Sequence, residues 1–201
     1  MNTPLAAVIV SFIGPMLALI ILFAALARRL RFDPRGAGWC VGLGLMALGA
    51  LMIPVAGLPL ARVLAAWMDH WSVPLLVLLV GGVSKTYFGA ELLRRKDRQA
   101  MWIFGVVTGV VLYPLALGIG SIDPFSHGWH FGPLFVVIGI VAMYLQWRRN
   151  RFGIVLLLAF CAWLVGLSES GNFWDCLTDP VFFFISIGAL VMSLVTKSKQ
   201  P

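Results

Sequence analysis

Two apolar runs, VLLLAFCAWLVGL (155–167) and VFFFISIGALVMSLV (181–195), flank the polar stretch SESGNFWDCLTDP (168–180). Each run approaches the ~20 mainly apolar residues that carry a helix across about 30 Å of hydrocarbon. The stretch between them holds three carboxylates and is too short to form a domain. The arrangement therefore predicts two membrane helices joined by a polar connection.

The same alternation of apolar segments and short polar connections runs through all 201 residues. Hydrophobic residues make up 61% of the chain and charged residues 11%, whereas average soluble domains are about 45–50% apolar and about 25% charged. A soluble domain of this length could not bury so much apolar surface. We therefore predict an all-α integral membrane protein with a single polytopic transmembrane domain over residues 1–201. The predicted bundle has seven transmembrane helices, with six as the alternative count, over residues 4–27, 39–60, 72–92, 100–119, 133–147, 152–167 and 180–195.

The basic residues indicate the orientation of this bundle. Apart from Arg62 and Lys85, every Lys and Arg lies in one of four segments that seven crossings place on the same side: 28–35, 94–98, 148–151 and 197–199. The positive-inside rule makes that side cytoplasmic. We predict an outer N-terminus, a cytoplasmic C-terminus and a multi-pass location in the inner (plasma) membrane. Because the net charge of +7 is concentrated at helix ends, the predicted partner is the lipid bilayer and nucleic acid is excluded.

The opposite side collects acids and imidazoles. It receives all three histidines and five of the eight acidic residues: His70, His127, His130, Asp69, Asp123, Glu169, Asp175 and Asp179. Control of topology does not require this enrichment. It predicts a polar site that faces the outer compartment.

Within the quoted polar stretch, the candidate site residues are Glu169, Asn172 and Asp175. In a helix, Asn172, Asp175 and Asp179 would share an arc of about 60°, and oxygen-rich side chains suit Mg²⁺ or Ca²⁺. Glu169 lies near the membrane boundary, where an ionisable group needs a cavity or a partner. Asp179 precedes Pro180, which predicts a helix N-cap followed by proline at the first helical position.

A second outer segment, SIDPFSHGWHFG (121–132), places His127 and His130 three residues apart, with Asp123 upstream. Imidazole together with carboxylate suits Zn²⁺ and similar ions. These three residues are the predicted metal ligands, and a divalent metal is the predicted cofactor. The alternative is a solvated loop, since Gly128 and Gly132 favour irregular backbone.

Lys85 is the only basic residue inside a predicted span. With Tyr87 it is the candidate lining of a polar cavity for a small solute. The alternative is a lysine that extends its side chain to the cytoplasmic interface.

Helix packing also leaves a pattern in the sequence. Gly105 and Gly109 form a G-x-x-x-G pair, which predicts a close helix contact. Pro54, Pro59 and Pro114 fall within predicted spans and predict kinks.

Three classes of function fit these features. The first is a carrier or permease for a small solute. The second is a membrane-embedded, metal-dependent hydrolase or lipid-modifying enzyme that acts at the outer face, in which the two outer loops would converge. The third is a non-catalytic assembly or accessory subunit, with a membrane protein partner or a homo-oligomer. No nucleotide-binding, serine-hydrolase or zinc-protease motif is present, so enzymatic activity is left open.

Overall fold

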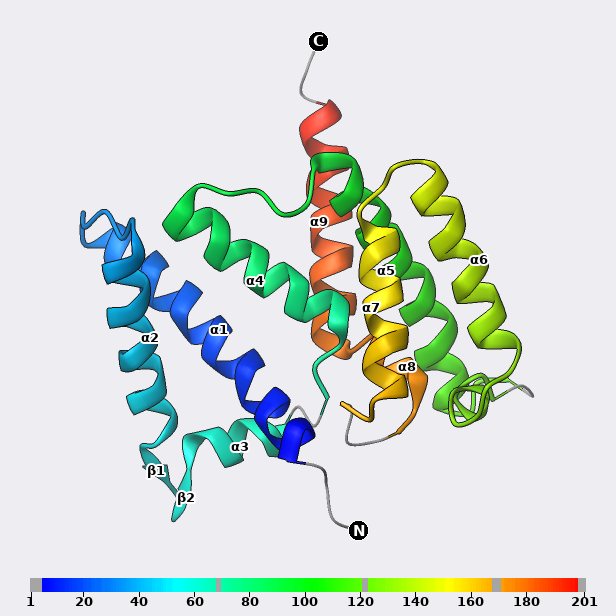
Figure 1. Ribbon diagram of the computed structural model, residues 1–201, viewed down its shortest axis with the longest axis horizontal. Coiled ribbons are helices and arrows are strands. Elements are labelled where there is room, and N and C mark those ends of the chain that lie inside the picture. The colour runs from blue at the N-terminus through cyan, green and yellow to red at the C-terminus, as the bar shows by residue number, and fades with distance from the viewer. Residues whose placement is uncertain (1–4, 68–69, 121–122, 168–170, 199–201) are drawn as a thin grey trace. The chain divides into compact units, whose positions relative to one another are not determined.

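The computed structural model describes residues 5–67, 70–120, 123–167 and 171–198, and these are predominantly helical (Figure 1). The all-α fold class is thus confirmed. The helices are α1 (Leu5–Arg29), α2 (Ala37–Leu51), α3 (Leu60–Trp67), α4 (Val73–Phe88), α5 (Arg95–Ala116), α6 (Pro133–Trp147), α7 (Phe152–Leu164), α8 (Phe173–Leu177) and α9 (Pro180–Ser198). A 3₁₀ turn, η1 (Phe125–Gly128), and a hairpin of β1 (Pro54–Val55) and β2 (Leu58–Pro59) complete the described elements.

The second predicted span, 39–60, is not one helix. Helix α2 ends at Leu51, and an antiparallel hairpin follows in which Pro54 pairs with Pro59. Ala56 and Gly57 have φ angles of 52° and 83°, the left-handed backbone of a tight two-residue hairpin turn. The prediction of a kinked helix through both prolines was wrong, because two prolines five residues apart remove backbone donors and block helix continuation.

Among the described residues, two helices are long and apolar enough to cross a membrane: Phe12–Arg29 of α1 and the whole of α5, with 18 and 22 residues. The apolar helices α2, α4, α6, α7 and α9 have apolar segments of 13–17 residues. At 1.5 Å per residue these segments span about 20–26 Å, which is less than the roughly 30 Å of a typical hydrocarbon core.

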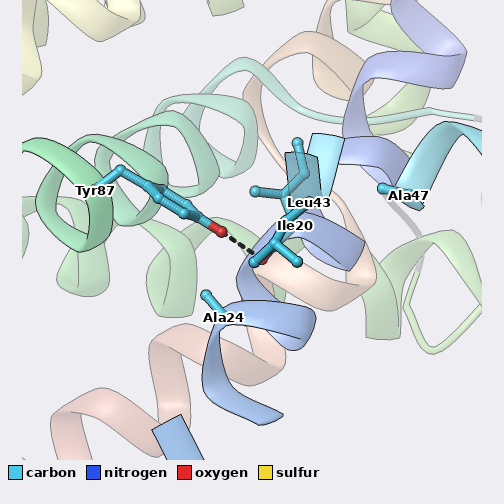
Figure 2. Packing of buried hydrophobic residues seen from close by; sticks show 5 residues of the cluster. All are labelled: Ile20, Ala24, Leu43, Ala47 and Tyr87. Atoms are coloured by element: carbon cyan, nitrogen blue, oxygen red, sulfur yellow. Dashed lines mark hydrogen bonds between the residues drawn. The ribbon is translucent and has the colours of Figure 1, made fainter. Parts of the chain in front are cut away.

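The chain divides into two compact units: residues 1–71 with 76–92, and residues 72–75 with 93–201. In the first unit α1 packs against α2 and α3. Its buried core consists of Ile20, Ala24, Leu43, Ala47 and Tyr87 (Figure 2). The Tyr87 hydroxyl points toward α1 and donates a hydrogen bond to the Ile20 carbonyl oxygen at 3.2 Å.

In the second unit α5 packs against α9, and α6 packs against α7. A Cβ atom at Gly105 would lie 2.9 Å from Phe182 Cε1, and one at Gly109 would overlap the Phe183 ring. The predicted close contact at the G-x-x-x-G pair is therefore confirmed, with α9 as the partner helix. Any larger side chain at these two positions would push α9 away.

A buried carboxylate joins two of the basic loops in the second unit. Asp97 is fully buried. Its Oδ2 accepts from the Arg94 backbone N–H at 2.9 Å, and its Oδ1 accepts from the Arg151 backbone N–H at 3.1 Å. Asn150 adds a bond from its amide to the Lys96 carbonyl at 3.3 Å. The segments around residues 94–98 and 148–151 consequently lie side by side at one end of the unit.

Candidate functional site

The polar loop that contains η1 and the polar stretch that contains α8 converge in the second unit, and Asn172 connects them. Its Oδ1 accepts from the Trp174 backbone N–H at 3.0 Å and so caps α8. Its amide nitrogen donates to the Phe125 carbonyl in η1 at 3.0 Å. The Trp174 indole donates to the Pro124 carbonyl at 2.7 Å. The candidate residue Asn172 thus positions the loops by backbone contacts, since an amide can serve as acceptor and donor at once.

Glycine at position 128 permits this approach. A Cβ atom there would lie 2.8 Å from Asn172 Cγ and 2.9 Å from Trp174 Cδ1. Gly128 is buried, so the contact lies inside the unit. The same segment that predicted a metal-binding loop therefore contributes backbone surface to a packed junction.

The three predicted metal ligands are exposed. Asp123 Oδ1 accepts from the Phe125 backbone N–H at 3.0 Å and closes a turn. His127 Nδ1 lies 3.2 Å from the Asp123 backbone oxygen, and not against its carboxylate. Within the described parts of the chain, no three His, Cys, Asp or Glu side chains, His130 included, gather as a metal site. The metal prediction therefore gains no support from this geometry.

Asp175 and Glu169 are the remaining predicted positions of the polar stretch. Asp175 lies in α8 and is partly exposed, close enough to Tyr113 to act on it electrostatically. Glu169 lies outside the described residues, as does Asp69.

Lys85 and Tyr87 do not share a cavity. Lys85 forms an ion pair with Glu91 at 2.7 Å, and both side chains are about half exposed or more. Tyr87 is buried against α1. The reason is local: residues two apart on a helix point about 200° away from each other. In the first unit, Lys85 therefore lies at the surface and Tyr87 lies in the buried core.

A buried polar cluster does occur in the second unit, around Asp179. This side chain is 3% exposed. Its Oδ1 accepts from the Phe182 backbone N–H at 2.8 Å, which confirms the predicted N-cap of α9. Its Oδ2 accepts from the Ser72 backbone N–H at 3.1 Å and from Ser72 Oγ at 2.5 Å. Ser72 immediately precedes α4, and its Oγ accepts from the Leu75 N–H at 3.4 Å. One carboxylate therefore caps α9 and holds Ser72, the residue that caps α4.

Two hydroxyl groups adjoin this carboxylate. Tyr113 Oη and Thr178 Oγ1 are buried atoms with no hydrogen-bond partner among the described residues. The two side chains are neighbours, without the geometry of a hydrogen bond between them, and Asp179 acts on Tyr113 electrostatically. Buried hydroxyls normally have partners, so each retains unused donor and acceptor capacity. We call Ser72, Tyr113, Thr178 and Asp179 the hydroxyl–carboxyl cluster.

Burial raises the pKa of Asp179 above its usual range. Hydrogen bonds from Ser72 and from the Phe182 backbone favour the charged form and act in the opposite direction, but desolvation is the larger effect. The Ser72 hydroxyl donates to this carboxylate at 2.5 Å, the distance of a charge-assisted hydrogen bond. The cluster can consequently bind a proton closer to neutral pH than an exposed aspartate would.

Sequence reasoning missed three members of this cluster. Ser72 stands two residues before Pro74 at the start of an apolar run, which is a helix-start signal. Tyr113 is a polar aromatic residue beside Pro114 inside a predicted span. Thr178 is a residue type common in turns, and nothing in its sequence context marks a site.

No known protein-family model matches this chain, and comparisons with curated proteins and with solved structures find no significant match.

Proposed function

We propose that this chain is a multi-pass protein of the inner membrane, crossed by seven helices with the N-terminus outside. Large apolar side chains exposed along its helices support the proposal; on α6 they include Val136, Val137, Ile140 and Met143. Soluble monomers rarely expose contiguous apolar patches of more than a few hundred Å². The short helices fit a bilayer that thins locally around them or interfacial side chains that extend their reach.

The positions of the basic loops support the same orientation. In the second unit, residues 94–98 and 148–151 are joined through Asp97. In the first unit, Arg28 donates to the Thr86 carbonyl at 3.5 Å, and the Gly36 N–H donates to the Tyr87 carbonyl at 2.8 Å. The ends of the first and third spans thus lie together, as cytoplasmic ends should. The hydroxyl–carboxyl cluster lies at the opposite end of α5 from Arg95.

Within this frame we propose that the protein is a carrier for a small polar solute, with the hydroxyl–carboxyl cluster as its binding site. The single observation that carries this proposal is a buried carboxylate beside two buried hydroxyls without partners. A buried ionisable group near the membrane boundary is costly unless it has a partner or faces a cavity. Tyr113 and Thr178 can donate to and accept from a solute hydroxyl, amide or carboxylate, while Asp179 exchanges a proton.

The test is electrical. Purified protein is reconstituted in liposomes on a solid-supported membrane and challenged with amino acids, simple sugars and short carboxylates under an imposed pH gradient. If the protein is a carrier, the liposomes should show a saturable, solute-dependent current that Tyr113→Phe and Thr178→Val each reduce. Ser126→Ala, an exposed hydroxyl outside the cluster, is the matched control and should leave the current unchanged. Equal currents in wild type, both cluster variants and protein-free liposomes contradict a carrier for these solutes.

A second candidate, an accessory subunit or homo-oligomer, is favoured by one feature of α2. A Cβ atom built at Gly38, Gly42 or Gly49 meets nothing within 4 Å, and at 100° per residue these three positions fall within an arc of about 40°. Such small-residue strips let membrane helices approach closely. Gly42→Leu should then abolish a cross-linked dimer or hetero-complex in native membranes, and Gly139→Leu, on the open side of α6, should not. Metal-dependent hydrolysis at the outer face stays an untested alternative.

A further inference from the structure

The basic end of the α5–α9 pair contains a groove that the proposed carrier function does not use. Its volume is about 90 Å³. Its walls carry two guanidinium groups, an amide, an indole and a hydroxyl; the lining residues are Arg95, Arg98, Gln99, Trp102, Ala189, Leu190 and Ser193. We call it the Arg95 groove.

Helix geometry explains why these groups converge. Positions 95, 98, 99 and 102 follow the i, i+3, i+4, i+7 spacing that puts side chains on one face of a helix. Farther along the same pair, Gly105 and Gly109 bring α5 and α9 into tight contact. Toward Arg95 the facing residue Ala189 is small, so the helices leave a gap there. The groove therefore follows from the spacing of these residues on α5 and the small size of Ala189 on α9.

The nearest acid in the sequence does not line the groove. Asp97, two residues from Arg95, points into the unit and gives both carboxylate oxygens to the backbone N–H groups of Arg94 and Arg151. Arg98 is anchored by a bond from its guanidinium to the Leu93 carbonyl at 2.9 Å. Guanidinium groups beside amide and hydroxyl donors match the oxygens of a phosphate group.

We infer that the Arg95 groove binds the phosphate headgroup of an anionic phospholipid of the cytoplasmic leaflet. Exposed apolar side chains also lie on both helices outside the groove lining, with Ile103 on α5 and Met192 and Leu194 on α9. Acyl chains can lie against such exposed apolar side chains, which a free anion does not need. Trp102 adds an amphipathic ring of the kind that anchors at the headgroup level. Basic pockets between membrane helices on this side of the bilayer commonly hold anionic headgroups. The inference rests on the proposed membrane orientation and is independent of transport.

The test uses the full chain in a neutral detergent and measures retained lipid by native mass spectrometry during titration with phosphatidylglycerol. Wild type should retain one phosphatidylglycerol in preference to phosphatidylcholine. Arg95→Gln should weaken this binding about tenfold, as expected for loss of a charge-assisted hydrogen bond. Arg148→Gln removes the same charge from the same end of the unit but outside the groove, and it should bind like wild type.

Further variants and a competition experiment distinguish a lipid site from diffuse surface attraction and from a site for soluble anions. Ala189→Phe fills the groove without changing charge and should abolish retention. Ile140→Phe adds an aromatic ring at an exposed position of α6, outside the groove, and should not. Equal weakening by Arg95→Gln and Arg148→Gln would show diffuse surface attraction and overturn the site. Displacement of the lipid by excess inorganic phosphate would show a soluble-anion site and overturn the lipid assignment. Because the readout is lipid binding in detergent, a failure here leaves the carrier assay untouched, and the reverse also holds.

Discussion

Removing the Asp179 carboxylate should destabilise the second unit more than removing any exposed acid. In Asp179→Ala, α9 loses its N-cap acceptor at the Phe182 N–H, and the buried Ser72 N–H and hydroxyl ahead of α4 lose their acceptor. A lost N-cap costs about 1 kcal/mol, and each buried donor left unsatisfied adds about 1–3 kcal/mol. The sum is about 3 kcal/mol or more. For a chain of this size that corresponds to a fall in Tm of about 6–12 °C.

The assay is thermal unfolding in detergent, followed by loss of helical circular dichroism. Asp123→Ala is the matched control, because Asp123 also caps a turn but is exposed; it should cost under about 0.5 kcal/mol. Asp179→Asn should fall between the two, since its amide oxygen can still accept. If Asp179→Ala unfolds within about 2 °C of Asp123→Ala, a margin below 1 kcal/mol, the Asp179 carboxylate does not stabilise the unit through these bonds and the reasoning fails.

Three other results should follow from the same contacts. Because the pKa of Asp179 is raised in the folded chain, its protonated form stabilises the fold; this contribution is full below the unfolded value of about 3.9 and is lost as pH rises through the folded pKa. The Tm of wild type relative to Asp179→Asn should therefore fall with rising pH, and parallel curves would contradict this. Gly109→Ala should cost about 1–3 kcal/mol by overpacking against Phe183, whereas Gly139→Ala, with open space at its Cβ position, should be neutral or stabilising by up to about 1 kcal/mol; similar Tm values for the pair would refute the close contact. Asn172→Ala should free the loop at 123–132 for proteolytic cleavage without lowering helix content, and an unchanged cleavage rate would show that the bond to the Phe125 carbonyl does not position that loop.

The features that sequence reasoning predicted correctly are local ones. Each predicted apolar segment contains a helix, because hydrophobicity acts over a single run of residues. A few neighbouring residues likewise sufficed to predict the N-cap at Asp179 and the close contact at Gly105 and Gly109. The hairpin at Pro54 and Pro59 was also a local signal, but the apolar composition of the run concealed it.

The features that sequence reasoning missed depend on distant residues. Ser72 and Asp179 are 107 positions apart, and neither segment indicates the other. The contact between the Asn172 amide and the Phe125 carbonyl involves a backbone group, which any residue type could supply. Lys85 and Tyr87 were grouped by proximity in sequence, although helix geometry separates them.

The membrane orientation of the second unit is the central claim, and labelling of single cysteines tests it most directly. In a chain whose three native cysteines are replaced by Ser, Ser126→Cys and Arg149→Cys are each treated with a membrane-impermeant thiol reagent. Labelling is done in intact spheroplasts and again after permeabilisation. The proposed orientation predicts that Cys at 126 reacts in both preparations and that Cys at 149 reacts only after permeabilisation. Labelling of both positions in intact spheroplasts, or of neither, would contradict a unit that crosses the membrane with its basic end in the cytoplasm.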